Sequence, residues 1–568
     1  MSHRVVFTPS GLEGTVDGAR TVLDAARQLG ADLDSVCGGR GICGRCEVVP
    51  TFGTFPKWAI TVTPDVFGAL NAVEREYAAR RGLASGSRLG CQLRLTTDAV
   101  IDVPPTSQVH RPVVRKHVDV GSLVVDPVTH LYYVVVEPAV LGDDRSAAAR
   151  LDEALTRDHA LGAVEWPVRL LPRLHGATAA KDGTTVAVAT AADGRRTAVA
   201  LWAGYIDRAF GVAIDVGSTT VAGHLCDLHT GEVLASSGLM NPQIRYGEDL
   251  MSRVSYVMMN PGGEANLTGA IRGALNDLVA SLVGQAGVDP DAVLDVVIVG
   301  NPIMHHLVLG IDPTPLGGAP FELAVSTAVH GRAADIGLDL ADAALYVAPC
   351  IAGHVGADTA AAILSEGPHR SDRVQLLVDV GTNAEIVLGN SSRLYAASSP
   401  TGPAFEGAQL SCGQRATVGA IERVRIDRHT LEPRFTVIGS DLWSDDPGFA
   451  EALVDAGASV TGVCGSGIIE VIGELFLSGI LRTDGTFDAS VMERSGRLEQ
   501  DGRTLAYVIH DAPGTRLRIT QNDVRAIQLA KAALRAGIEL LRDHSGFTQI
   551  DDVRLAGAFG SHIDPLYA

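Results

Sequence analysis

The chain has 568 residues, of which 46% are hydrophobic and 20% charged, so it is long enough for three or four globular domains. Its formal net charge of −20 argues against nucleic-acid binding, which needs a basic surface, and against binding to anionic membranes. No apolar run reaches about 18 residues, so we expect no transmembrane helix.

The placement of the cysteines indicates a reducing compartment. A predicted strand begins at residue 4, which leaves no room for an export signal. Four cysteines lie near the N-terminus, and the other four are scattered singly, so we expect the latter to be reduced thiols. These single cysteines are Cys226, Cys350, Cys412 and Cys464. We therefore predict a cytoplasmic protein.

The N-terminal cysteines have the spacing of an iron–sulfur site. Cys37, Cys43 and Cys46 stand at C-x5-C-x2-C spacing among several glycines, and Cys91 follows much later. Plant-type ferredoxins bind a [2Fe–2S] cluster through C-x4-C-x2-C and a distant cysteine, and the longer first gap occurs in ferredoxins of the adrenodoxin kind. Structural zinc, the alternative, usually needs two C-x2-C pairs, and this set has one. The four cysteines thus predict a [2Fe–2S] cluster.

The elements around these cysteines predict a β-grasp-like ferredoxin domain over residues 1–103. We expect strands at residues 4–7, 13–16, 47–49 and 100–103, with helices over residues 21–30 and 69–81. Pro104 and Pro105 open a predicted linker over residues 104–112, because prolines stiffen the chain and stop helices.

Residues 113–207 predict a small α+β middle domain. We expect a buried strand at residues 131–136, a helix over residues 147–157, and strands at residues 184–190 and 197–202. We find no catalytic constellation in this segment, which favours a spacer or docking role.

Residues 208–568 contain an internal repeat. Residues 212–236 and 376–398 each predict three strands, and the first turn of each copy follows an Asp-Val-Gly sequence that begins at Asp215 or Asp379. Glycine lets such a turn approach a ligand closely, hydroxyls and turn N–H groups bind phosphate oxygens, and aspartate holds Mg²⁺ through water. Two such turns on opposite sides of a cleft would grip a triphosphate.

Four short segments carry the predicted nucleotide contacts. They are Gly217, Ser218, Thr219 and Thr220 in the first turn, Gly381, Thr382 and Asn383 in the second, Gly465, Ser466 and Gly467 before a helix, and Gly557, Ala558, Phe559 and Gly560 after a strand. Glycines before a helix form a natural anion site, and the small residues of the last segment would let an adenosine lie against the backbone. The amphipathic helix predicted over residues 523–541 should face the core.

The paired hairpins and the Gly-Ala-Phe-Gly segment resemble those of the acetate and sugar kinase, Hsp70 and actin superfamily. With a ferredoxin domain in front, the chain is similar to the reductive activators of corrinoid proteins, and residues 241–249, 399–407, 463–468 and 528–532 carry that resemblance. It implies a multidomain α/β protein whose ATPase domain is a duplicated ribonuclease-H-like fold.

The resemblance also implies a repair reaction. One electron would pass from the [2Fe–2S] cluster to cobalt(II) of a corrinoid protein, giving cobalt(I), and hydrolysis of Mg²⁺-ATP would drive the step. Asp215 and Asp379 would act at the phosphates, and Glu406, with Glu248 or Asp249, would orient Mg²⁺ or the attacking water. Solvated or helix-capping carboxylates are the equal alternative for these last residues. The implied partners are a corrinoid protein of a methyltransferase system and an upstream electron donor, and related ATPases are often dimers.

Two other functions stay open. The chain could transfer electrons with a domain that only senses nucleotide, or it could activate another low-potential enzyme, as 2-hydroxyacyl-CoA dehydratase activators do without a ferredoxin domain. His305 and His306 follow an Asn-Pro turn and are expected to be structural. Members of the family continue beyond the Gly-Ala-Phe-Gly segment, so we expect a shortened C-terminus that affects ATP binding.

Overall fold

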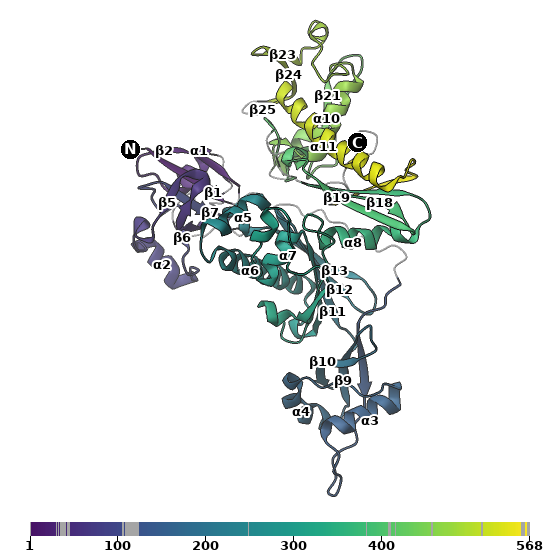
Figure 1. Cartoon of the computed structure of the whole chain (residues 1–568). Coiled ribbons are helices and arrows are strands. Elements are labelled where there is room, and N and C mark those ends of the chain that lie inside the picture. The colour runs from purple at the N-terminus through teal and green to yellow at the C-terminus, as the bar shows by residue number, and fades with distance from the viewer. Residues whose placement is uncertain are drawn as a thin grey trace. The chain divides into compact units, whose positions relative to one another are not determined.

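The computed structural model describes residues 2–8, 10–29, 31, 33, 41, 46–104, 107, 124–247, 249–381, 383–406, 410–414, 416–455, 458–512, 515–557 and 563–564 (Figure 1). Contacts divide the chain into two compact units, residues 116–358 and residues 1–115 together with 359–568. Within the described ranges, no helix combines the length and the apolar character that a bilayer crossing requires.

The N-terminal part is a five-stranded mixed sheet with the order β2-β1-β7-β3-β6. Its strands are β1 (Ser2–Thr8), β2 (Leu12–Asp17), β3 (Glu47–Thr51), β6 (Arg88–Leu89) and β7 (Ala99–Asp102), and a side hairpin joins β4 (Gly53–Phe55) to β5 (Ile60–Val62). Helix α1 (Val22–Leu29) shares one core with the sheet, and α2 (Ala72–Arg81) begins at a capping box on Asn71. The strands and helices predicted here are confirmed to within a few residues.

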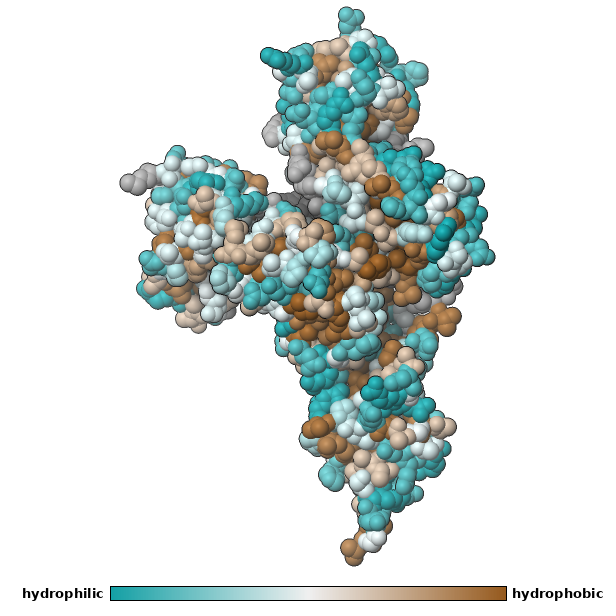
Figure 2. Space-filling model, in the orientation of Figure 1, coloured by the Kyte–Doolittle hydropathy of each residue, from teal (hydrophilic) through white to brown (hydrophobic). Residues whose placement is uncertain are grey.

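The middle part is a three-stranded antiparallel sheet with the order β10-β9-β8. Strands β8 (Thr129–Val134), β9 (Thr184–Thr190) and β10 (Arg196–Ala203) pack with helices α3 (Ala147–His159) and α4 (Leu174–Thr178). The strand predicted at residues 131–136 is confirmed with a shift of two residues, but its predicted burial is wrong, because β8 lies at the sheet edge with Leu131, Tyr132 and Tyr133 half-buried. On the face in view, Figure 2 shows mainly hydrophilic side chains over this module.

Residues 210–347 form a six-stranded sheet with the order β13-β12-β11-β14-β16-β15. Its strands are β11 (Phe210–Val216), β12 (Thr220–Asp227), β13 (Val233–Met240), β14 (Val293–Gly300), β15 (Val329–Arg332) and β16 (Ala344–Val347). Strands β11 to β13 are an antiparallel meander, and β14 returns parallel to β11. The helices that follow β13 in this part are α5 (Leu250–Met259), α6 (Gly263–Ala286) and α7 (Pro302–Leu309), and α8 (Ala357–Glu366) follows β16 and belongs mostly to the other unit.

A second sheet repeats this arrangement with the order β19-β18-β17-β26. Strands β17 (Gln375–Val380), β18 (Ala384–Asn390) and β19 (Arg393–Ser399) form the meander, and β26 (Asp552–Ala556) returns parallel to β17 after helix α11 (Gln521–Ser545). Both sheets thus share a meander, a helix and a parallel return strand, which confirms the predicted repeat.

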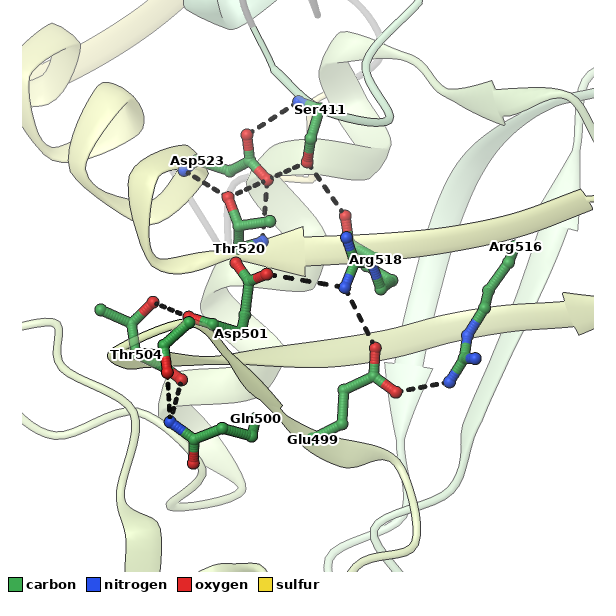
Figure 3. Close-up of polar contacts among 10 residues, drawn as sticks. Ser411, Glu499, Gln500, Asp501, Thr504, Arg516, Arg518, Thr520 and Asp523 are labelled. Atoms are coloured by element: carbon green, nitrogen blue, oxygen red, sulfur yellow. Dashed lines mark hydrogen bonds and ion pairs between the residues drawn. The ribbon is translucent and has the colours of Figure 1, made fainter.

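A large insertion separates β19 from α11. It contains β20 (Ala420–Ile426), β21 (Pro433–Val437), β22 (Gly462–Val463), α9 (Phe449–Asp455) and α10 (Gly465–Leu477), and then the antiparallel strands β23 (Leu498–Asp501), β24 (Thr504–Ala512) and β25 (Thr515–Thr520). Figure 3 shows how its end joins α11: the buried Asp523 carboxylate accepts hydrogen bonds from Thr520 and from Ser411. Asp523 therefore ties the start of α11 to the chain that follows β19.

Candidate functional site

The first predicted phosphate turn joins β11 to β12 at the carboxyl end of β11. Gly217 N–H donates to the Thr220 carbonyl at 3.1 Å, and a Cβ on Gly217 would lie 2.5 Å from the same oxygen. Glycine is therefore required for the tightness of this turn. Asp215, half-buried near the end of β11, pairs across the hairpin with Ala222.

The three consecutive carbonyls of this turn are held by side chains and backbone from outside the hairpin. Asn241 Nδ2 donates to the Gly217 carbonyl at 2.8 Å, and Asn241 N–H donates to the Thr219 carbonyl at 2.8 Å. Arg253 Nη2 donates to the Ser218 carbonyl between them. The amides of Ser218 and Thr219 have no acceptor within the described ranges of the chain, so they are open to an anion.

The second predicted turn joins β17 to β18 and is supported differently. Gly381 N–H donates to the Asn383 carbonyl at 3.1 Å, and Thr401 Oγ1 donates to the Gly381 carbonyl at 3.0 Å. Asp379 pairs in register with Ala556, so β26 brings Gly557 beside it. A Cβ on Gly557, whose φ is +84°, would lie 2.2 Å from Asp379 Oδ1, so any side chain there would displace this carboxylate. Thr382 and residues 558–560 lie outside the described residues.

A cavity of about 490 Å³ lies beside the strands that carry this second turn. Its wall is mostly apolar, formed by α10 and α11 together with Val380, Leu555 and Ile563. Gln528 and Lys531 of α11 add polar groups. A mostly apolar cavity with a few polar groups is the usual form of a small-molecule site.

The remaining predicted nucleotide residues lie in less open surroundings. Gly465, Ser466 and Gly467 form the first turn of α10 and are buried, with Ser466 Oγ 3.3 Å from Cys464 Sγ. A Cβ on Gly467 would lie 2.5 Å from the Ile421 carbonyl of β20, so packing accounts for this glycine, and a phosphate contact in the segment stays a prediction. The Asp249 carboxylate caps α5 by accepting from Ser252 N–H at 2.7 Å, so for this residue the capping alternative is confirmed. Glu248 and the Glu406 side chain lie outside the described residues.

Two of the four predicted cluster cysteines come together at the paired ends of β3 and β6. Cys46 and Cys91 are buried, with exposed fractions of 1% and 6%, and Gly90 N–H donates to the Cys46 carbonyl at 2.7 Å. Gln92 Nε2 donates to Cys91 Sγ at 3.6 Å. Cys37 and Cys43 lie outside the described residues, and within the described ones no three metal-binding side chains form a group.

A buried ion pair supports the Cys91 segment, and sequence reasoning missed it. The Glu74 carboxylate, fully buried on α2, accepts from Arg88 Nη2 at 2.8 Å and from Leu89 N–H at 3.1 Å. Burial alone would raise the pKa of Glu74, but hydrogen bonds from Arg88 and from Asn71 N–H outweigh it and lower that pKa. This pair fixes β6 just before Cys91. The two residues are fourteen positions apart in the sequence, so a pattern of neighbouring residues could not predict their contact.

The paired histidines of α7 are buried, as a structural role requires. His306 Nδ1–H donates to the Pro302 carbonyl at 2.8 Å, and Nε2 accepts from Ala324 N–H at 3.0 Å. Both ring nitrogens of His305 lack a hydrogen-bond partner among the residues that the structure describes, and burial lowers the pKa of His305 to about 4. The four single cysteines are free thiols, and burial raises the pKa of each, to about 12 for Cys350 and Cys412.

The sequence matches the profiles of a known protein family. Three family profiles match consecutive parts of the chain: the RACo linker region over residues 119–208, the RACo middle region over residues 210–371, and the C-terminal domain of RACo, described as the ASKHA domain, over residues 373–568. The chain belongs to the RACo family. Its expected resemblance to reductive activators of corrinoid proteins is thereby confirmed.

Individual relatives agree with the RACo assignment. The corrinoid activation enzyme RamQ of Eubacterium limosum is 33% identical over 367 residues, which cover 62% of this chain and 58% of RamQ. A reductase of Methanosarcina barkeri, named for a Co(II) methylated amine-specific corrinoid protein, is 24% identical over 372 residues, covering 62% of this chain and 64% of its own. Each match therefore spans less than two thirds of the relative.

A solved structure extends the likeness to nearly the whole chain. The reductive activator for corrinoid, iron–sulfur protein superposes with a TM-score of 0.67 and 28% identity, covering 98% of this chain and 86% of that one. The RACo fold, with its ASKHA domain, therefore accounts for the duplicated sheets described above.

The Glu74–Arg88 pair gives a prediction with a matched control on the same helix. Glu74→Gln leaves the buried Arg88 charge without its partner, which should cost about 3–5 kcal/mol of local stability. Hydrogen–deuterium exchange of peptides that span residues 71–93 should then become much faster. Glu76→Gln breaks only the exposed pair with Arg80, so it should change exchange by at most about 0.5 kcal/mol. Equal exchange in both variants would contradict the supporting role of the buried pair.

Proposed function

We propose that this RACo-family protein is an ATP-dependent reductive activator of a corrinoid protein, acting in the cytoplasm. It would pass one electron to cobalt(II) of the partner's corrinoid and so return the cobalt to the cobalt(I) state. The observation that supports this proposal best is that one chain contains two buried cysteines of the predicted cluster set and, on two similar sheets, the two turns predicted to bind phosphate. The names of the RamQ and reductive-activator relatives support the same substrate.

We assign the N-terminal part as the ferredoxin-type domain that holds a [2Fe–2S] cluster. Cys37, Cys43, Cys46 and Cys91 would bind it, and the two described cysteines fit because both are buried thiols at one sheet end, with Gln92 donating to sulfur. When bound, such a cluster supplies single electrons at low potential. The backbone around Cys46 and the Glu74–Arg88 pair would hold the cysteines in place and exclude water.

We assign residues 208–568 as the ATPase domain. The open amides of Ser218 and Thr219 would bind phosphate oxygens, with Asp215 and Asp379 organising Mg²⁺, and Thr382, Asn383 and the segment from Gly557 to Gly560 would complete the site. Glu406 is the proposed residue that orients the attacking water. We further place the adenosine in the cavity beside Val380, Leu555 and Ile563, because it borders the strands that lead to the second turn and to Gly557.

Two leucines of α11 test the place of the adenosine. Leu534 lines the cavity, whereas Leu529 is 72% exposed on the same helix and lies outside the lining. Leu534→Trp should fill the cavity and weaken ATP binding at least about tenfold, or about 1.4 kcal/mol, in a calorimetric titration. Leu529→Trp should leave the affinity unchanged. If both variants bind ATP like the wild type, the adenosine lies elsewhere.

A cobalt assay tests the function itself. The pre-reduced protein is mixed without oxygen with a cobalt(II) corrinoid protein, and the cobalt(I) absorption band is followed with and without Mg²⁺-ATP. Cobalt(I) should appear only with ATP, and it should be lost in Asp215→Ala and in Cys91→Ser. Cys226→Ser, a change of a cysteine outside the predicted cluster set, serves as the matched control and should keep the activity.

Two results would contradict the proposal. If Cys91→Ser kept full activity, the electron would not pass through a cluster that Cys91 binds. Cobalt(I) formation that does not depend on ATP would favour the alternative of an electron carrier with a nucleotide-sensing domain.

A further inference from the structure

We propose that Arg253 is a positioning residue for the triphosphate: it orients the first phosphate turn and supplies a fixed positive charge beneath it. The proposal rests on the proposed function, because it assumes that ATP binds at this turn. Arg253 lies on α5, thirty-five positions after Ser218 in the sequence, and it is fully buried.

The guanidinium of Arg253 bonds to the turn and to the segment between β13 and α5. Nη2 donates to the Ser218 carbonyl, Nε donates to the Gly247 carbonyl at 3.0 Å, and Nη1 donates to Gln243 Oε1 at 3.2 Å. Gln243 is itself fully buried and donates to the Leu267 carbonyl at 2.9 Å. The guanidinium therefore has a fixed position directly behind the middle residue of the turn.

These contacts orient the turn for anion binding. With the carbonyls of Gly217, Ser218 and Thr219 all engaged by Asn241 and Arg253, the peptide planes of the turn are fixed. The amides of Ser218 and Thr219 then have no acceptor among the described residues. Consecutive free amides of this kind bind anions such as phosphate.

Packing and hydrogen bonding do not explain why the buried residue at position 253 carries a charge. All of its hydrogen bonds among the described residues go to neutral oxygens or to the Met304 sulfur, and the nearby Asp249 carboxylate is engaged in capping α5. A buried cation without an ion-pair partner among the described residues is costly, and a neutral donor could serve the Ser218 carbonyl as Asn241 serves its neighbours. An anionic ligand on the other side of the turn would offset that cost, and a triphosphate is such a ligand.

Two substitutions separate the charge from the hydrogen bonds. Arg253→Lys keeps the positive charge with fewer donors, and Arg253→Gln keeps a donor without the charge. Arg272→Gln is the matched control: Arg272 is a half-buried arginine of the same unit whose Nε donates to the Val308 carbonyl at 2.9 Å, away from the turn. The dissociation constants of ATP, ADP and adenosine are measured by calorimetry for the full-length protein and each variant.

The proposal predicts a loss of binding affinity that is larger for ligands with more negative charge. Arg253→Gln should weaken ATP at least about tenfold, ADP less, and adenosine hardly at all, and Arg253→Lys should recover part of the ATP affinity. Local unfolding of the site would weaken ATP and adenosine alike, so an unchanged ATP-to-adenosine ratio would overturn the proposal. Equal affinities in the Lys and Gln variants would also overturn it. If the wild type itself binds no ATP, the proposed function fails first, and this outcome is distinct from the others.

Discussion

Backbone carbonyls that turn away from water need hydrogen-bond donors, and this need shapes the turn between β11 and β12, where we propose that phosphate binds. The hairpin does not supply them: its strand amides pair along β11 and β12, and the amides of Ser218 and Thr219 bond to none of these carbonyls. Asn241 and Arg253 supply them from the segment that follows β13. The direction in which the turn presents its amides therefore depends on a helix and a loop that lie outside the hairpin.

The two turns show that a repeated fold need not repeat its supports. Both follow an aspartate and a valine on the first strand of a meander, and both have a parallel return strand beside them. The second turn is held by Thr401 and approached by Gly557, and no buried arginine lies behind it in the described part of the chain. In our proposal the two turns thus contribute unequally: the first supplies fixed positive charge, and the second brings a carboxylate against the segment that begins at Gly557.

The sequence was sufficient to predict those features that depend on patterns of neighbouring residues. The predicted strands around the Asp-Val-Gly sequences at Asp215 and Asp379 identified both meanders. The Cys46 and Cys91 positions also come together as expected. Features that depend on distant contacts could not be predicted, because neither Arg253 behind Ser218 nor Glu74 against Arg88 leaves a periodic signal. The edge position of β8 was missed for a related reason: an apolar run looks alike in a covered and in a half-covered strand.

In our proposal ATP hydrolysis, rather than nucleotide binding alone, drives electron transfer to the corrinoid. The most direct measurement counts, in one anaerobic reaction, the phosphate released and the cobalt(I) formed, with ATP and with an analogue that cannot be hydrolysed. Each 59 mV of uphill transfer lowers a one-electron equilibrium constant about tenfold. We therefore expect cobalt(I) to form only as phosphate is released, and almost none to form with the analogue. An equal yield of cobalt(I) with the analogue would contradict it, because nucleotide binding alone would then account for the transfer.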